Sequence, residues 1–137
     1  KKYSDRLSSV IDDMKNKKYT ELTNSTKCYR PWGSYESLKK DKGFQIKEII
    51  INPKSSISLQ KHKKRSEHWV VIEGMPTVTK GKKVFQLKKN QSIDIKIGEI
   101  HRLENKTNKI VKIIEIQTGN YIGEDDIVRY EDKYKRI

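Results

Sequence analysis

Four polar side chains with the chemistry of metal ligands are spaced among short apolar runs. Gln60, His62 and Glu67 lie in the stretch SLQKHKKRSEHWVVIEG (58–74), and His101 lies in IKIGEIHRLEN (95–105). Imidazole nitrogens together with carboxylate and amide oxygens suit a divalent transition metal such as zinc, manganese, iron, cobalt or nickel. Taken alone, each residue is better explained as a hydrogen-bonded core histidine or a surface glutamate near a turn. Their joint spacing favours a metal site.

Strand geometry predicts that these side chains converge. Side chains two residues apart on a strand face the same way, so Gln60 and His62 point together, and a turn at 63–66 lets the next strand bring Glu67 alongside them. His68 points away from Glu67, which favours packing or a contact between subunits over catalysis. Gly98 allows a tight turn just before His101. We therefore expect the four candidate ligands to meet inside a β-barrel.

The middle of the chain, from residue 44 to about residue 117, has the pattern of an all-β domain. Turn signals such as Asn52-Pro53 and Lys80-Gly81 separate short β-rich runs. The runs are FQIKEIII, SISLQKH, EHWVVIEG, TVTK, KKVFQL, SIDIKI, IHRLEN and IVKIIEIQ. This number of short strands indicates a sandwich or a closed barrel.

The two ends of the chain have different patterns. Apolar residues at i, i+3, i+4 and i+7 predict one amphipathic helix over about residues 4–17, with Ser4 as its N-cap. A polar linker follows, so we divide the chain into an N-terminal helix and linker (1–28) and a barrel domain (29–137). The last segment, 118–137, is expected to be a loop and a short helix. The helical apolar residues are Leu7, Val10, Ile11 and Met14.

Composition narrows the class of protein and its partners. With 137 residues, 33% hydrophobic and 36% charged, the chain fits one domain with a compact core. The net charge of +13 comes from scattered lysines rather than a basic stripe with aromatics, which argues against nucleic acid and leaves a small anionic substrate compatible. A single cysteine, Cys28, suits a reducing compartment. No apolar run approaches the roughly 20 residues of a membrane span, so we expect a cytoplasmic protein without a membrane partner.

The candidate ligands also lie in recognisable motifs. Gln60-x-His62, then Glu67 and Gly74, and later Gly98-x-x-His101 with Asn105, resemble the two cupin motifs, with glutamine in place of the usual first histidine. Together with YRPWGSYESL (29–38) and QTGNYIGEDDIVRYEDKYKR (117–136), they make the chain resemble the C-terminal cupin domain of type II phosphomannose isomerases over about residues 3–136.

This resemblance implies a fold and an activity. The implied fold is a double-stranded β-helix, or jelly-roll, cupin barrel that forms a homodimer. The implied activity is the metal-dependent interconversion of mannose 6-phosphate and fructose 6-phosphate for the biosynthesis of GDP-mannose and polysaccharide, with one divalent ion on Gln60, His62, Glu67 and His101. In that family the domain often follows a mannose-1-phosphate guanylyltransferase domain. No Gly-rich nucleotide loop occurs in these 137 residues, so we do not assign guanylyltransfer to them.

Substrate contacts and two other function classes stay open. Arg129 is expected to bind phosphate or polarise substrate oxygens, with an ion pair to a nearby Asp or Glu as the alternative. Lys61, Lys63 and Arg65 flank the site and are interpreted as gathering the substrate phosphate, or else as a solvated turn. An iron oxygenase, built on two histidines and one carboxylate, and a non-catalytic sugar-binding or assembly module are the alternatives. Turnover of mannose 6-phosphate with and without chelator separates them from an isomerase.

Overall fold

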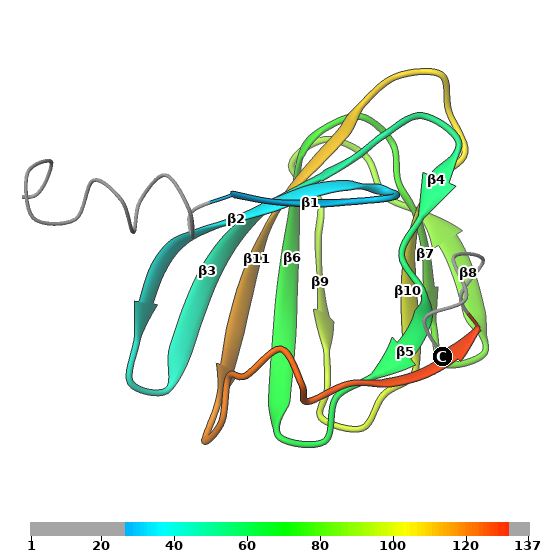
Figure 1. Cartoon of the computed structure of the whole chain (residues 1–137). Helices are drawn as coiled ribbons and strands as arrows, with labels where there is room; N and C mark the ends of the chain where they lie inside the picture. The colour runs from blue at the N-terminus through cyan, green and yellow to red at the C-terminus, as the bar shows by residue number, and fades with distance from the viewer. Residues whose placement is uncertain (1–26, 132–137) are drawn as a thin grey trace, which may run out of the picture.

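The structure, a computed structural model, describes residues 27–131, and every regular element in this range is a β-strand (Figure 1). The helix predicted over about residues 4–17 lies outside the described residues. None of the described segments is a helix long and apolar enough to cross a membrane. The strands are β1 (Lys27–Arg30), β2 (Gly33–Asp41), β3 (Phe44–Ile51), β4 (Ser55–Ser56), β5 (Leu59–Lys61), β6 (Arg65–Glu73), β7 (Thr77–Lys80), β8 (Lys83–Gln86), β9 (Ser92–Ile95), β10 (His101–Asn105), β11 (Val111–Gly119) and β12 (Val128–Glu131).

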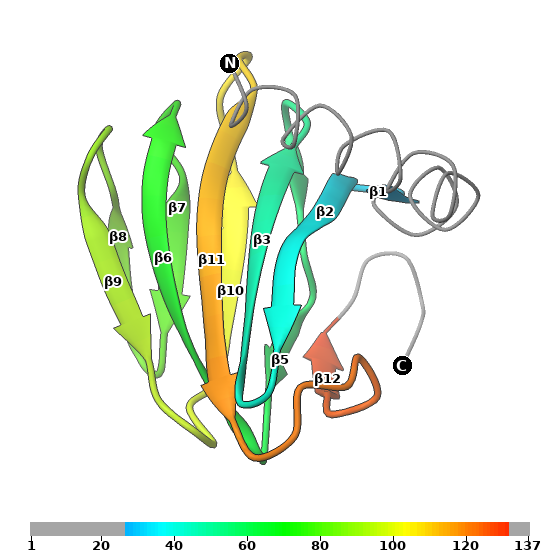
Figure 2. The same cartoon turned by 90° about the vertical axis from the view of Figure 1, so that its left-hand side faces the viewer.

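The strands form two antiparallel sheets that face each other. The first sheet has the order β1-β2-β3-β11-β6-β9, and the second has the order β12-β5-β10-β7-β8, with β4 also paired to β10. In the first sheet β11 lies between β3 and β6, so it joins parts of the chain that are far apart in sequence (Figure 2). The space between the sheets holds both the core and the candidate site.

Side-chain alternation explains why the long strands face the way they do. In β3, β6 and β11 buried residues alternate with half-buried ones along most of the strand, as expected where one sheet face packs on a core. Trp69 and Val71 are buried on the same face of β6 as Glu67, whereas His68 is only partly buried on the opposite face. This confirms the facing predicted for β6.

The apolar core fills one end of the space between the sheets. Its members are Trp32, Ile49, Ile51, Trp69, Val71, Val78, Leu87, Ile95, Leu103, Val111 and Ile113. Asn105, which is fully buried, closes this end by donating from Nδ2 to the backbone carbonyls of Ile51, Asn52 and Lys109 at 3.0, 3.2 and 2.6 Å. These bonds satisfy carbonyls of two loops and fix the loops to each other.

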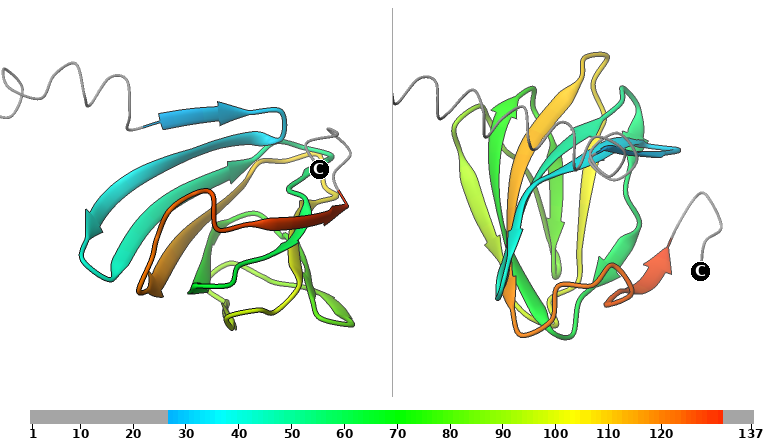
Figure 3. Two further views of the ribbon diagram at one scale, coloured as in Figure 1. Left: turned by 60° about the horizontal axis from the view of Figure 1, so that its bottom comes forward. Right: turned by 60° about the vertical axis from the view of Figure 1, so that its left-hand side comes forward.

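The eight predicted runs correspond to the strands from β3 to β11, but two parts of the barrel differ from the expectation. Strands β1 and β2, at the edge of the first sheet, were not predicted. The expectation of a loop and a helix over 118–137 is wrong for residues 128–131, which form strand β12 beside β5 (Figure 3). The short strand β5 offers a free edge, and pairing of Val128 with Lys61 and of Arg129 with Gln60 fills it.

Candidate metal site and adjoining cavity

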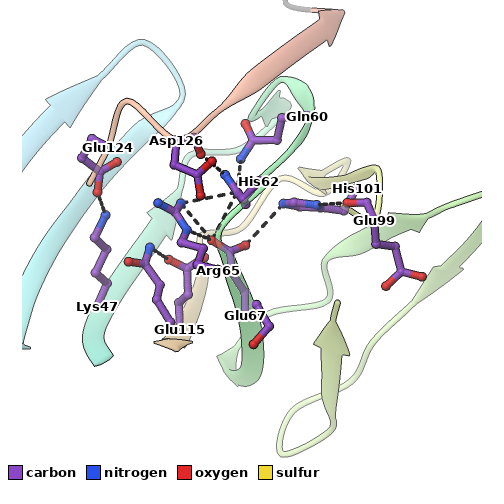
Figure 4. A network of polar contacts seen from close by, with 12 residues as sticks. Lys47, Gln60, His62, Arg65, Glu67, Glu99, His101, Glu115, Glu124 and Asp126 are labelled. Carbon is purple, nitrogen blue, oxygen red and sulfur yellow. Dashed lines mark hydrogen bonds and ion pairs between the residues drawn. The ribbon is translucent and has the colours of Figure 1, made fainter. Parts of the chain in front are cut away.

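Three of the four predicted ligands meet in the interior. His62, Glu67 and His101 are all buried, and their ligand atoms lie within 4.8 Å of one another (Figure 4). The Nε2 atom of His62 is 3.3 Å from Oε2 of Glu67, and Nε2 of His101 is 3.3 Å from Oε1 of the same carboxylate. Two imidazole nitrogens therefore face one carboxylate from two sides.

Backbone pairing between separate segments brings these residues together. His101, the first residue of β10, is paired with Gln60 of β5, and His62 follows directly after β5. The backbone N–H of Gly98 donates to the carbonyl of His62 at 2.7 Å. Gly98 has a φ of 79°, a conformation that glycine adopts without steric cost. The turn before His101 is thus hydrogen-bonded to the segment that carries His62. The sequence predicted the turn at Gly98 but not this hydrogen bond.

Each imidazole is held by a backbone carbonyl on its other nitrogen. Nδ1 of His62 lies 2.6 Å from the carbonyl oxygen of Asp126, and Nδ1 of His101 lies 2.8 Å from that of Glu99. A carbonyl only accepts hydrogen bonds, so Nδ1 is the protonated nitrogen in each neutral ring and Nε2 carries the lone pair. This is the arrangement by which proteins orient metal-binding histidines.

The cluster has the electrostatics of a cation site. Oε1 of Glu67 and Nε2 of His101 are buried and have no hydrogen-bond partner among the described residues, and a lone pair facing a carboxylate is unfavourable unless a cation or a proton lies between them. Burial raises the pKa of Glu67, but His101, His62 and Arg65 outweigh burial and lower it below its usual range. Burial lowers the pKa of His62 and keeps it neutral. The donor set and the orphaned atoms therefore fit a divalent metal.

The charge state of His101 depends on the same carboxylate. Burial lowers its pKa, whereas the interaction with Glu67 raises it by more, so the net direction is upward. A proton on His101 and a metal ion thus compete for the same place beside Glu67.

Gln60, the fourth predicted ligand, adjoins the cluster through its amide nitrogen. Nε2 of Gln60 is 3.3 Å from Nε2 of His62, while its Oε1 accepts a hydrogen bond from Ser58 at 2.7 Å. The amide must therefore turn over before its oxygen can face a metal. Its role as a ligand stays a prediction.

Arg65 is part of the buried cluster rather than of an exposed turn. Its Nε and Nη2 atoms donate to Oε2 of Glu67 at 3.1 and 3.0 Å, and Nη2 lies 3.3 Å from Nε2 of His62. The side chain is buried. The fork of Arg65 thus orients the carboxylate and keeps it ionised. Arg65 is the first residue of β6, and alternation along this strand places Arg65 and Glu67 on one face. The prediction of a turn at 63–66 missed this because it left Arg65 out of the strand.

The loop before β12 supports the site from outside. The carboxylate of Asp126 accepts hydrogen bonds from the backbone N–H groups of Lys63 and Lys64, both at 2.9 Å, while its carbonyl holds His62. Burial raises the pKa of Asp126, but these two backbone donors and the positive charges nearby lower it overall. Asp126 therefore positions His62 through both its main chain and its side chain. This role could not be predicted from the sequence because Asp126 lies in a loop, where no strand or helix period applies.

A cavity of about 140 Å³ adjoins the cluster. Charged residues from several strands line it beside aromatic and apolar ones. The lining residues are Arg30, Trp32, Tyr35, Lys47, Ile49, Ile57, Gln60, Arg65, Glu67, Glu115, Glu124, Ile127 and Arg129. Because Gln60, Arg65 and Glu67 belong both to the cavity wall and to the cluster or its immediate surroundings, a ligand in the cavity would contact the cluster directly.

Glu115 and Lys47 face each other across β3 and β11 in this cavity. Both are buried. Glu115 accepts hydrogen bonds from Nε1 of Trp69 at 2.9 Å and from Nε2 of Gln117 at 2.6 Å, whereas Lys47 makes an ion pair with Glu124. Burial, followed by the charge of Glu67, raises the pKa of Glu115 to about 7. Neither residue was predicted as functional, although both are charged residues at inward positions of their strands.

The remaining predicted residues lie in different places. Arg129, on β12, lines the cavity, while Lys61 and Lys63 do not. The Nζ atom of Lys61 lies 5.8 Å from the centre of the Tyr130 ring, and Lys63 is exposed. His68 faces away from the cluster on the outer side of β6.

Comparison with solved structures shows which fold the chain has. The chain resembles a double-stranded β-helix protein from Klebsiella pneumoniae with a TM-score of 0.67 at 15% identity, over 81% of this chain and 95% of that one. It resembles oxalate decarboxylase from Bacillus subtilis with a TM-score of 0.70 at 11% identity, over 79% of this chain and 30% of that one. At such low identity the likeness shows the fold alone, which is the cupin fold, a double-stranded β-helix.

Sequence comparison narrows the class to one family. Residues 16–132 match the family model described as Mannose-6-phosphate isomerase C-terminal, and the chain belongs to this family. It is 44% identical over 130 residues to the xanthan biosynthesis protein XanB of Xanthomonas campestris pv. campestris, covering 95% of this chain and 28% of that protein.

Two further relatives agree with this assignment. The alginate biosynthesis protein AlgA of Pseudomonas putida is 49% identical over 117 residues, 85% of this chain and 24% of that protein. Mannose-1-phosphate guanylyltransferase 2 of Escherichia coli O157:H7 is 36% identical over 129 residues, 94% of this chain and 27% of that protein. The chain therefore spans about a quarter of the length of the curated relatives it matches.

Proposed function

We propose that this chain is a metal-dependent isomerase domain that interconverts mannose 6-phosphate and fructose 6-phosphate. The observation that carries the proposal is the buried cluster of His62, Glu67 and His101, in which both Nε2 lone pairs face one carboxylate beside a charged cavity. The family supplies the substrate class.

The proposed metal ligands are Gln60, His62, Glu67 and His101. A bound divalent ion would supply Lewis-acid stabilisation of the negative charge that develops on the substrate oxygens. The chain's own contribution is orientation: carbonyl groups of Asp126 and Glu99 fix the two imidazoles, and Arg65 fixes the carboxylate.

An aldose-ketose shift also needs a group that takes a proton from one carbon and returns it to the neighbouring carbon. We assign this role to Glu115. Three carboxylates line the cavity, of which Glu67 belongs to the cluster and Glu124 is 54% exposed and paired with Lys47. Glu115 is buried, and Trp69 and Gln117 hold its two oxygens in place. Its carboxylate would accept the proton from C2 and, as the carboxylic acid, return it to C1, while the hydroxyl proton passes from O2 to O1.

The chain offers a matched experiment because it has three histidines, two in the cluster and one on the outer face. Purified wild type, His62→Ala and His68→Ala are assayed for bound metal and for conversion of mannose 6-phosphate, with chelator and after addition of each divalent ion. We expect loss of metal and activity in His62→Ala alone, with chelator reproducing the loss in wild type. A wild-type chain inactive with every divalent ion would overturn the proposal.

A second candidate function is supported by the relatives. Because proteins with guanylyltransferase and polysaccharide biosynthesis names contain a similar segment in about a quarter of their length, the domain is also consistent with a non-catalytic sugar-binding or assembly part of such a protein. Binding of mannose 6-phosphate without turnover would favour this alternative.

The iron oxygenase alternative would require oxygen consumption by the iron-loaded chain.

We also propose that the chain forms a homodimer and serves GDP-mannose supply. The name of the mannose-1-phosphate guanylyltransferase relative supports GDP-mannose supply, and the names of the xanthan and alginate relatives support polysaccharide biosynthesis. Support for the dimer comes from the outer face of the first sheet, where apolar side chains of three adjacent strands remain partly exposed. They are Ile46, Ile50, Val70, Ile72, Ile114 and Ile116. Light scattering tests this, and a monomer at all concentrations would contradict it.

A further inference from the structure

Four cationic side chains line the cavity, and two of them are already neutralised by carboxylates. Arg65 is paired with Glu67 and Lys47 with Glu124. The other two, Arg30 and Arg129, have no carboxylate partner among the described residues. Cations without a carboxylate at the wall of a cavity are the groups that remain available to an anionic ligand.

Arg129 has more unengaged N–H donors than Arg30. Its side chain makes no hydrogen bond or ion pair within residues 27–131, and its Nε atom is shielded from solvent without a partner. The acidic residue of the same strand, Glu131, pairs with Arg102 instead at 3.3 Å. The ion-pair alternative considered for Arg129 therefore has no support among the described residues. A shielded donor without a partner is unfavourable unless a ligand completes its hydrogen bond.

Arg129 is also held next to the proposed metal ligands. Its backbone is paired with Gln60, and residues paired across antiparallel strands project their side chains to the same side. A group bound by Arg129 would therefore lie on the same side of the β5–β12 pair as Gln60, in the cavity that both residues line.

Arg30 is held beside the cavity by the side chain of Tyr35 and the backbone of Tyr29. Its guanidinium carbon lies 5.3 Å from the centre of the Tyr35 ring, Nη1 donates to the carbonyl of Tyr29 at 3.0 Å, and Nη2 donates to the hydroxyl of Tyr35 at 3.4 Å. An arginine has five N–H donors, so donors remain for a ligand after these two bonds.

We propose that Arg129 and Arg30 form the binding site for the phosphate group of the sugar phosphate. This inference rests on the proposed function for the identity of the ligand. The reacting carbons C1 and C2 and the phosphate on C6 lie at opposite ends of the substrate, so one cavity must offer two separate polar sites. The cluster of His62, Glu67 and His101 receives the reacting end. Two guanidinium groups suit a phosphate because their planar donor pairs match its oxygens.

From the sequence, two groups were expected to contact the phosphate: Arg129, which the cavity retains here together with Arg30, and the group of Lys61, Lys63 and Arg65. Neither lysine lines the cavity, and the donors of Arg65 are engaged by Glu67, His62 and the carbonyl of Gly123. The two hypotheses therefore predict losses in different variants.

The test compares binding of mannose 6-phosphate, mannose and inorganic phosphate by titration calorimetry in wild type and three charge-matched variants. Arg129→Gln removes the proposed contact, Lys63→Gln removes the alternative one, and Lys83→Gln on β8 removes a remote exposed charge. We expect Arg129→Gln to weaken mannose 6-phosphate and inorganic phosphate about tenfold to a hundredfold, to leave mannose unchanged and to keep bound metal. Arg129→Lys, which retains charge but loses the paired donors, should recover part of the loss, and Arg30→Gln should show a smaller loss.

The outcomes separate this inference from the proposed function. A phosphate-specific loss in Arg129→Gln supports the inference even if no variant, wild type included, has isomerase activity. Unchanged binding in Arg129→Gln, or an equal loss in Lys63→Gln, overturns it even if the wild type is an active isomerase. Should Arg129→Gln unfold, as far-ultraviolet circular dichroism would show, Arg129→Lys decides: full wild-type affinity for inorganic phosphate in that variant and in Arg30→Gln would contradict the inference.

Discussion

The interior of the barrel has a polar half and an apolar half, although the same three strands, β3, β6 and β11, build both. Each strand changes from polar to apolar inward residues partway along, and the strand registers align these changes. The polar half contains Gln45, Lys47, Glu67, Glu115 and Gln117, and the apolar half contains Ile49, Ile51, Val71, Val111 and Ile113. In the first, charges are held by ion pairs and hydrogen bonds; in the second, only packing is available.

This difference separates stability from chemistry. Burying charged groups is unfavourable unless each is paired, and a buried pair contributes little net stability. Close-packed apolar groups stabilise by roughly 25 cal/mol per Å² of buried area. We infer that the apolar half holds the fold and thereby fixes the geometry of the polar half. Variants in the two halves should therefore fail in different ways.

The largest effect is expected for His101→Ala in the polar half. Loss of a ligand should remove the metal and reduce turnover of mannose 6-phosphate about a thousandfold, while the barrel stays folded because the apolar half is intact. Metal analysis, turnover and circular dichroism measure the three quantities. His101→Ala with full activity would contradict both the ligand assignment and the division into halves.

A smaller loss of turnover, about a hundredfold, is expected for Glu115→Gln because it removes the proposed proton carrier but no ligand. Metal content and the KM for mannose 6-phosphate should stay close to wild type, whereas kcat should fall. Steady-state kinetics at saturating metal give this comparison. An unchanged kcat would exclude Glu115 from proton transfer.

In the apolar half, Leu103→Ala should destabilise the fold by about 2–5 kcal/mol, the usual cost of a large cavity in a core. Leu103 is fully buried and is two residues from His101 on the same strand, so it is a close structural counterpart of the ligand variant. Urea denaturation followed by tryptophan fluorescence measures the change. The folded fraction should bind metal with wild-type stoichiometry, and loss of metal from folded protein would show that the halves are not separable.

The pH dependence of stability should reveal the raised pKa of Glu115. Its pKa rises from 4.5 in the unfolded chain to about 7 in the fold, so the metal-free folded state binds more protons in this interval and stability falls as pH rises from 4.5 to 7. The Glu115→Gln variant lacks this contribution. In chelator, the unfolding free energy of wild type minus that of Glu115→Gln should therefore decrease over the interval, as denaturation at pH 5 and pH 8 would measure. A constant difference would contradict the raised pKa.

The smallest effect is expected for Gln60→Ala. Its amide nitrogen, not its oxygen, faces His62, and water can replace a neutral amide oxygen as a ligand. We expect a loss of activity well below that of His101→Ala, with metal retained, in the same turnover and metal assays. A loss equal to that of His101→Ala would make Gln60 an obligatory ligand.

Local sequence pattern was sufficient to predict the long strands that have one face turned inward, and to predict the cluster of His62, Glu67 and His101. Period-two alternation placed Glu67 and His68 on opposite faces of β6, and a glycine before His101 indicated the turn that the structure contains. These features depend on residues a few positions apart, which a single sequence displays directly.

Features that depend on distant pairing could not be predicted in this way. Strand β12 forms because it pairs with β5, and β2 ends in charged, exposed residues without alternation. Lys47 and Glu115 were visible as polar residues in apolar runs, but only the pairing of β3 with β11 shows that they face each other. The burial of Arg65 likewise follows from its contacts with Glu67 and with the loop at Gly123.

The position of β11 between β3 and β6 has a consequence for a chain that is still being synthesised. The ribosome completes β3 and β6 long before it reaches Val111, so the nascent chain carries two strands whose facing edges have no partner. Such unpaired edges invite pairing with other chains. The first sheet can be completed only after Gly119 has left the exit tunnel and β11 can pair with β3 and β6. A nascent chain stopped at residue 110 should therefore remain sensitive to protease and dependent on chaperones.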